Sequence, residues 1–253
     1  MRCAKDGHPG RIALYSGNMK YAGRKRLVLW LGAASAIIAV SVFMTLPVGL
    51  TGKPLSLSSF VTIARNKRLV TILVVTMLQI SGQITIFVYL APLLRRLIGA
   101  GDLAVEGFFA FYGVAALVGN MIATAVVTAL CTEVTLALFL GSITLGLAVW
   151  TAGLGSFVAA VVGIFFWGLG FAASNSMQQA RLAETAPDLA SASIALNTSL
   201  VYVGQAIGSG IGGLLFARGG FTAMGAVGIA FLIAASALLA VTWQRKRPLI
   251  AAA

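Results

Sequence analysis

The chain has 253 residues, of which 59% are hydrophobic and only 9% are charged, and its formal net charge is +12. Soluble domains carry about 25% charged residues, so this composition excludes a fold whose whole surface faces water. The basic residues lie between long apolar runs and form no patch on a folded domain, so we expect no nucleic-acid partner.

Seven apolar runs follow one another along the chain, and each reaches the length that a helix needs to cross a bilayer. The sequence therefore predicts an all-α polytopic membrane protein with the lipid bilayer as its surroundings. The seven predicted transmembrane helices are Leu27–Leu50, Leu69–Leu93, Gly107–Leu130, Val134–Gly153, Phe157–Met177, Ala190–Phe216 and Phe221–Trp243.

The same pattern divides the chain into segments. We expect a polar basic leader at 1–26, a first transmembrane helix at 27–50, a basic cytoplasmic loop at 51–68, six further helices at 69–243 and a tail at 244–253. The leader has no helical periodicity and is expected to be disordered. It has a long basic region, and no small-residue cleavage site follows the apolar run, so it is not a secretory signal. A misassigned start or a frameshift is the alternative interpretation of this leader.

Lys and Arg are unevenly distributed between the two expected sides of the membrane. Outside the leader, eight lie on the side of the 51–68 loop and the tail, and three lie on the other side, at Arg95, Arg96 and Arg218. The positive-inside rule then predicts a cytoplasmic C-terminus in a bacterial inner membrane. Seven further basic residues in the leader favour the opposite side, so the side of the leader stays open.

The stretch "GSGIGG" in the sixth run matches the G-x-G-x-x-G pattern of dinucleotide-binding loops. Such a loop follows a strand and needs an acidic residue about 20 positions later, whereas no Asp or Glu occurs after Asp188. We therefore expect no dinucleotide cofactor. Gly204, Gly208 and Gly212 recur every four residues, which predicts close packing between membrane helices.

Polar side chains inside the runs are candidates for a substrate-binding cavity, because polar groups in hydrocarbon are costly unless they are paired or face water. Trp167 and Asn175 belong to a row at four-residue steps, and Gln79 and Gln83 are one turn apart. The alternative for each is a hydrogen bond between neighbouring helices. The candidates are Gln79, Gln83, Tyr112, Asn120, Trp167, Asn175, Asn197 and Gln205.

The predicted spans contain few residues of the types that catalyse reactions. The six acids all lie outside the deep part of the runs, and the single histidine, His8, is in the leader. No cluster of His, Asp or Glu falls inside a span, so we expect no catalytic residues and no metal site.

Two stretches carry a resemblance to a known family: "LTGKPLSLSSFVTIARNKRLVTILVVTMLQISGQITIFVYLAPLL" and "NSMQQARLAETAPDLASASIALNTSLVYVGQAIGSGIGGLLF". They resemble the central loop with helix seven, and helices ten and eleven, of major facilitator superfamily transporters of the drug/proton antiporter or sugar-efflux type. The resemblance implies that the chain corresponds to helices six to twelve. Six helices would then form one transporter half, as two inverted three-helix repeats.

The resemblance implies a function in efflux of small organic molecules as the C-terminal half of a proton-coupled transporter, with a missing N-terminal half as partner. The carboxylate that carries protons in this family generally belongs to that first half. The alternative is a truncated, non-transporting remnant or a membrane interaction protein. A seven-helix receptor is a weaker third hypothesis.

Overall fold

The computed structural model describes residues 29–30, 32–33, 35–45 and 57–244. The chain divides into two compact units, 1–54 and 55–253. In the first unit an uninterrupted apolar helix covers Ser35–Thr45. The predicted leader at 1–26, parts of the predicted first transmembrane helix and nearly all of the tail lie outside the described residues.

The second unit is built from helices, and the described residues contain no strand. Five helical segments are long and apolar enough to cross a membrane: Lys67–Phe87, Asp102–Ala152, Phe157–Thr185, Pro187–Ala217 and Phe221–Trp243. Large apolar side chains also cover the outside of this unit, among them Leu117 at 68% and Met121 at 73% exposed. The protein is therefore a multi-pass, all-α membrane protein.

The start of this unit differs from the prediction. The predicted loop at 51–68 contains helix α2, Leu57–Arg65, and a single residue separates it from α3, Lys67–Phe87. Asn66 caps α3, since its side chain accepts hydrogen bonds from the backbone N–H groups of Arg68 at 3.0 Å and Leu69 at 3.4 Å. A short linking helix thus replaces most of the described part of the expected loop.

The predicted second span is also wrong in its extent, because it breaks into α3 and a separate helix α4, Leu90–Ile98. Pro92 accounts for the break. A proline has no N–H to donate to the carbonyl four residues earlier, here that of Val88, and its ring collides with that carbonyl. Gly99 then ends α4 in the left-handed conformation, with φ of 64°.

The predicted third and fourth spans correspond to two helical limbs, together labelled α5, Asp102–Ala152, which meet at a single non-helical residue. Cys131 has φ of 60° and ψ of 161°, outside the helical region. The limb before Cys131 runs parallel to α6, Phe157–Thr185, since Gly168 lies against Tyr112 and Ser176 bonds Asn120. The limb after Cys131 runs antiparallel to α6, because Gly170 lies against Ile143 and Gly163 against Trp150. The chain therefore reverses at Cys131.

The last elements agree better with the sequence. The predicted fifth span ends too early, at Met177, because α6 continues to Thr185. A single 3₁₀ turn, η1 at Pro187–Leu189, leads into α7, Ala190–Ala217, and α8 follows at Phe221–Gln244. The expected boundaries of the sixth and seventh spans lie within one residue of α7 and α8.

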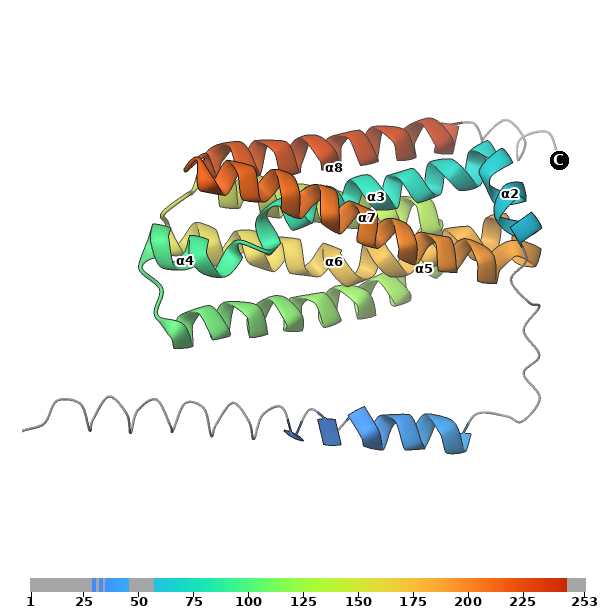
Figure 1. The fold of residues 1–253 in the computed structure, drawn as a ribbon, viewed down its shortest axis with the longest axis horizontal. Coiled ribbons are helices and arrows are strands. Elements are labelled where there is room, and N and C mark those ends of the chain that lie inside the picture. Colours follow the sequence, from blue (N-terminus) through green and yellow to red (C-terminus); the bar gives the residue numbers. More distant parts are fainter. Residues whose placement is uncertain (1–28, 31, 34, 46–56, 245–253) are drawn as a thin grey trace, which may run out of the picture. The chain divides into compact units, whose positions relative to one another are not determined.

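Two helices are central to the packing. Helix α3 contacts α7 and α8, and α6 contacts both limbs of α5 (Figure 1). Glycines permit the close approaches: a Cβ on Gly82 of α3 would lie 2.6 Å from the carbonyl oxygen of Gly228 in α8. Figure 1 shows α2 beside the C-terminal end of α8 and α4 near the opposite end of the unit.

Candidate functional site

Gln79 and Gln83 of α3 are buried inside the unit, with 0% and 1% of their surface exposed. Their four-residue spacing places both on one face of the helix. The Gln79 side-chain N–H₂ group donates to the Ser174 hydroxyl of α6 at 2.6 Å. The Gln83 side chain donates more weakly to the backbone carbonyl of Gln79, at 3.4 Å.

Trp167 of α6 completes this polar contact. It is fully buried, and its indole N–H donates to the side-chain oxygen of Gln83 at 3.0 Å. The hydrogen bonds of Gln79 and Gln83 therefore join α3 to α6 at two levels, one turn apart. Side-chain hydrogen bonds of this kind hold membrane helices together.

An aromatic cluster surrounds the Gln83–Trp167 contact. The Tyr112 ring, from the first limb of α5, lies 5.6 Å from Trp167 at an interplanar angle of 80°, and 5.7 Å from Phe171. Phe87 of α3 lies 5.0 Å from Tyr112 and 5.7 Å from Trp167. Edge-to-face arrangements at these distances are favourable for aromatic rings. The polar pair is thus enclosed by apolar ring surface.

Asn120 and Asn175 form a separate and less buried group. The Ser176 hydroxyl of α6 donates to the side-chain oxygen of Asn120 at 2.7 Å. The Asn175 side chain donates to the Phe171 backbone carbonyl at 3.0 Å, within its own helix. Both asparagines are half-buried.

The two candidates on α7 form no hydrogen bond with the other candidates in the described part of the chain. Asn197 is 2% exposed, and its side-chain oxygen has no hydrogen-bond partner among the described residues. Gln205 is half-buried and follows Gly204, the first residue of the glycine row. The structure therefore brings together Gln79, Gln83, Tyr112 and Trp167, whereas Asn197 and Gln205 do not bond this group.

The glycine row lies against α3. A Cβ on Gly204 would lie 2.7 Å from the Met77 carbonyl oxygen. A Cβ on Gly208 or Gly212 would collide with the carbonyl oxygens of Ser81 and Thr85. All three glycines are buried, so α7 approaches the backbone of α3 over two helical turns.

Sequence reasoning missed several polar residues in the last two turns of α6. Gln178 is 0% exposed and Arg181 is 4% exposed, and the guanidinium Nη1 of Arg181 donates to Gln178 Oε1 at 3.0 Å. The predicted span ends at Met177, which places these residues in a loop. The spacing of Ser174, Gln178 and Arg181, at i, i+4 and i+7, is the signal that the helix continues. Arg181 therefore lies in a helix and not in a loop. It should be left out of the count of eight basic loop and tail residues that predicted the orientation.

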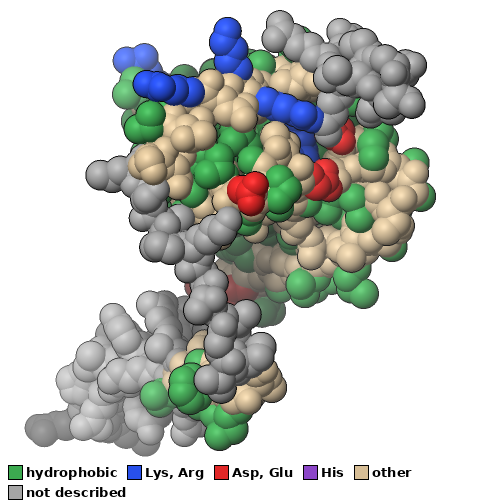
Figure 2. Space-filling model, turned by 90° about the vertical axis from the view of Figure 1, so that its right-hand side faces the viewer, with side chains coloured by type: hydrophobic (Ala, Val, Ile, Leu, Met, Phe, Trp, Pro, Cys, Tyr) green, Lys and Arg blue, Asp and Glu red, His purple; other side chains and the backbone are tan. Residues whose placement is uncertain are grey.

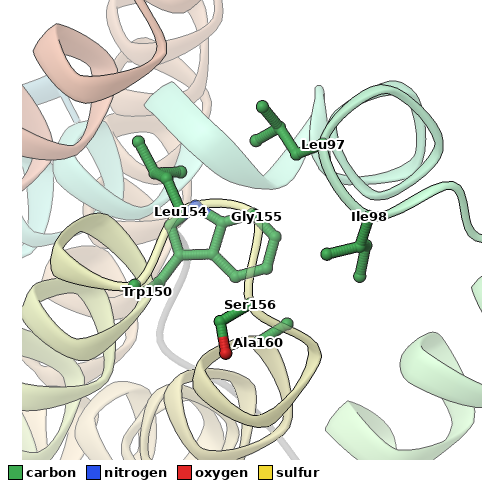
Figure 3. Close-up of a pocket in the computed structure, with 8 residues that line it drawn as sticks. Leu97, Ile98, Trp150, Leu154, Gly155, Ser156 and Ala160 are labelled. Carbon is green, nitrogen blue, oxygen red and sulfur yellow. The ribbon is translucent and has the colours of Figure 1, made fainter.

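A pocket at the other end of the unit does not involve the polar candidates. Figure 3 shows it between the end of α4, the α5–α6 connection and the first turn of α6. Apart from Ser156 its lining is mainly apolar: Leu97, Ile98, Trp150, Gly153, Leu154, Gly155, Ser156 and Ala160. In Figure 3 the Trp150 side chain lies among the other lining residues, close to Leu154 and Gly155 of the α5–α6 connection.

No protein-family model matches the chain. The chain is similar to an uncharacterized MFS-type transporter, YbcL, of Bacillus subtilis (strain 168), with 25% identity over 209 residues. This similarity supports membership in the MFS-type transporters. It covers 80% of this chain and 53% of the relative, so the match spans about half the length of the curated relative.

Proposed function

We propose that residues 67–243 form one six-helix half of a major facilitator transporter that exports small organic molecules across a bacterial inner membrane. The observation that carries the proposal is the buried amide and aromatic cluster of Gln83, Tyr112 and Trp167, in a chain similar to an MFS-type transporter. Such a cluster offers hydrogen bonds and ring surface to an amphipathic organic solute.

The packing of the helices supports an inverted pair of three-helix repeats. If α3 and the two limbs of α5 are one repeat, α6, α7 and α8 are the other. In this arrangement α3 contacts the last two helices of the second repeat, and α6 contacts the last two of the first. A two-fold axis exchanging the repeats would produce this reciprocal pattern.

Substrate in this architecture binds between two such halves, so a second helical bundle supplies the other wall. On this side we assign Gln79, Gln83, Asn120, Asn175, Asn197 and Gln205, with Tyr112 and Trp167, as the substrate-contacting set. Asn120 and Asn175 are half-buried and thus less enclosed than Gln79 and Gln83. Gln83 and Trp167 become accessible when α6 moves relative to α3. The C-terminus lies in the cytoplasm, and a proton gradient drives export.

The test is efflux of a panel of fluorescent amphipathic drugs from an efflux-deficient bacterial host. The chain is expressed alone, and then with the segment of YbcL that the match leaves uncovered. We expect no efflux by the chain alone and reduced drug accumulation with the second segment. Gln83→Leu abolishes that reduction, whereas Ser236→Ala, whose hydroxyl bonds only its own helix at Leu232, leaves it intact.

Two results would contradict the proposal. Unchanged accumulation of the whole panel in the presence of a correctly inserted second segment argues against export. Efflux by the chain alone, abolished by a proton uncoupler, shows that no second bundle is needed.

A further inference from the structure

Five buried side-chain atoms in the described part of the chain have no hydrogen-bond partner. They are Gln79 Oε1, Gln178 Nε2, Arg181 Nε, Ser193 Oγ and Asn197 Oδ1. Each of the five residues is 4% exposed or less. They come from α3, α6 and α7, and from no other described helix.

These residues lie along the region where the three helices meet. Gln79 bonds Ser174, and Ser174, Gln178 and Arg181 follow one face of α6 toward its C-terminal end. Leu182, next to Arg181, packs in one cluster with Leu69 of α3 and Ala192 of α7.

The α7 residues point into the same region. Asn197 is one turn after Ser193 and seven residues before Gly204, which contacts α3, so the three share one face of α7. We call the five residues with unpartnered atoms the polar seam. It runs from Gln79 in the middle of α3 to the end of the unit where α6 ends and α7 begins.

The hydrogen-bond donors and acceptors of the polar seam determine which ligand fits it. Gln178 and Arg181 present unmet donors, Gln79 and Asn197 present unmet acceptors, and the Ser193 hydroxyl can do either. An anion would satisfy only the donors, and Glu133 and Glu184 are close enough to interact with the charge of Arg181 and to oppose an added anion. Water both donates and accepts, so it meets all five requirements.

The free-energy cost of burying polar atoms also favours bound water at these positions. A buried polar atom that forms no hydrogen bond is destabilising, and native proteins satisfy such atoms with protein groups or ordered water. An arginine inside a membrane segment faces the bundle interior or a water-filled space. The end of the unit beyond Arg181 also carries charged side chains of both signs, as Figure 2 shows, so it borders the aqueous phase.

We propose that α3, α6 and α7 hold a file of bound water molecules along the polar seam, which enters beside Arg181 and reaches the Gln79 side chain. The file lies inside one helical unit and does not depend on the transport proposal. Through this file, water from one end of the bundle reaches the buried Gln79 side chain of α3.

The test uses silver ions, which carry their charge only through hydrated paths and bind thiolates. Ser193→Cys and Asn197→Cys are made separately in the full chain with Cys3→Ser, and the exposed Cys131 serves as an internal positive control. Ala173→Cys is the matched control, because Ala173 is 0% exposed and belongs to the apolar core of α6. After silver treatment and a chloride quench, the protein is denatured, alkylated and analysed by peptide mass spectrometry.

We expect silver to protect the introduced thiol from alkylation at least about tenfold faster in Ser193→Cys and Asn197→Cys than in Ala173→Cys, since reaction requires a solvated thiolate. Protection in both seam variants as slow as in the Ala173→Cys control would overturn the proposal. Only protein that elutes as a single species in detergent is scored.

A second measurement does not use thiols. Asn197→Leu keeps the approximate volume and removes the amide. If water bonds the Asn197 oxygen, the substitution loses that bond and the thermal unfolding temperature falls. If the oxygen is unbonded, removing a buried polar group raises the temperature. An unchanged or raised unfolding temperature therefore contradicts a water at Asn197.

Discussion

The Trp167 indole N–H donates to the side-chain oxygen of Gln83 at 3.0 Å across the interface between α6 and α3. Both side chains are almost completely buried, at 0% and 1% exposed. If this contact couples the two helices, its energy can be isolated with a double-mutant cycle of Trp167→Phe and Gln83→Leu. We expect a coupling free energy of about 0.6 to 1.7 kcal/mol, between the average and the largest values for such bonds in membrane proteins. The measurement is the free energy of unfolding in mixed detergent micelles, and strictly additive single effects would show no coupling.

Gly208→Ala should destabilise the unit, because a Cβ at this position collides with the Ser81 carbonyl oxygen of α3 and forces α7 outward. Gly210 is the matched control on the same helix, since a Cβ there meets nothing within 4 Å. Gly210→Ala should be neutral or stabilising, by up to about 1 kcal/mol, because alanine favours a helix over glycine. Thermal unfolding in detergent compares the two variants, and equal unfolding temperatures would contradict the close α3–α7 contact.

Asn66→Ala should lower the free energy of unfolding by about 0.5 to 2 kcal/mol, because it leaves the first N–H groups of α3 without their cap. Asn66→Asp keeps an oxygen in the same place and should retain most of the stability. The measurement is chemical unfolding of the two variants beside the unmodified chain. A loss of equal size in both would show that the side-chain oxygen does not act as the cap.

Cys131 gives a direct test of the proposed orientation. It is exposed at the reversal of α5, and the next residue, Thr132, donates to Glu184 at 2.6 Å, near the end of α6. Leu182, half a turn before Glu184, packs with Ile63 of α2, so Cys131 lies at the α2 end of the unit. With the proposed cytoplasmic α2 end, a membrane-impermeant maleimide should label Cys131 of a Cys3→Ser chain in inverted vesicles and not in intact spheroplasts. Labelling in spheroplasts would reverse the orientation.

Helix α7 shows most clearly which features of the fold can be predicted from the sequence. The glycines at 204, 208 and 212 predicted a packing face, and the same residues lie against the α3 backbone. The helix bounds also agree with the apolar run. Hydrophobic length and small-residue spacing are properties of one segment, so they can be found without knowledge of its neighbours.

The ends of α3 and α6 show where such local patterns fail. A count of apolar residues carries the second span through Pro92, although proline chemistry breaks the helix before it, so that α3 ends at Phe87 and α4 begins at Leu90. The same count ends the fifth span at Met177, because Gln178 and Arg181 are polar. Helix α6 continues through both residues, and both side chains are buried inside the unit.

By itself, the sequence determined that this chain is a helical membrane protein, which residues of its helices are polar, and where close helix packing occurs. Only the tertiary structure decided which of those polar residues meet. It joined Gln83 to Trp167 and Gln79 to Ser174, while it left the side-chain oxygens of Asn197 and Ser193 buried in the polar seam without a protein partner. The physical reason is that a span's length depends on the chain's own composition, whereas a hydrogen bond between helices depends on their register and rotation, which the packing of all the helices sets together.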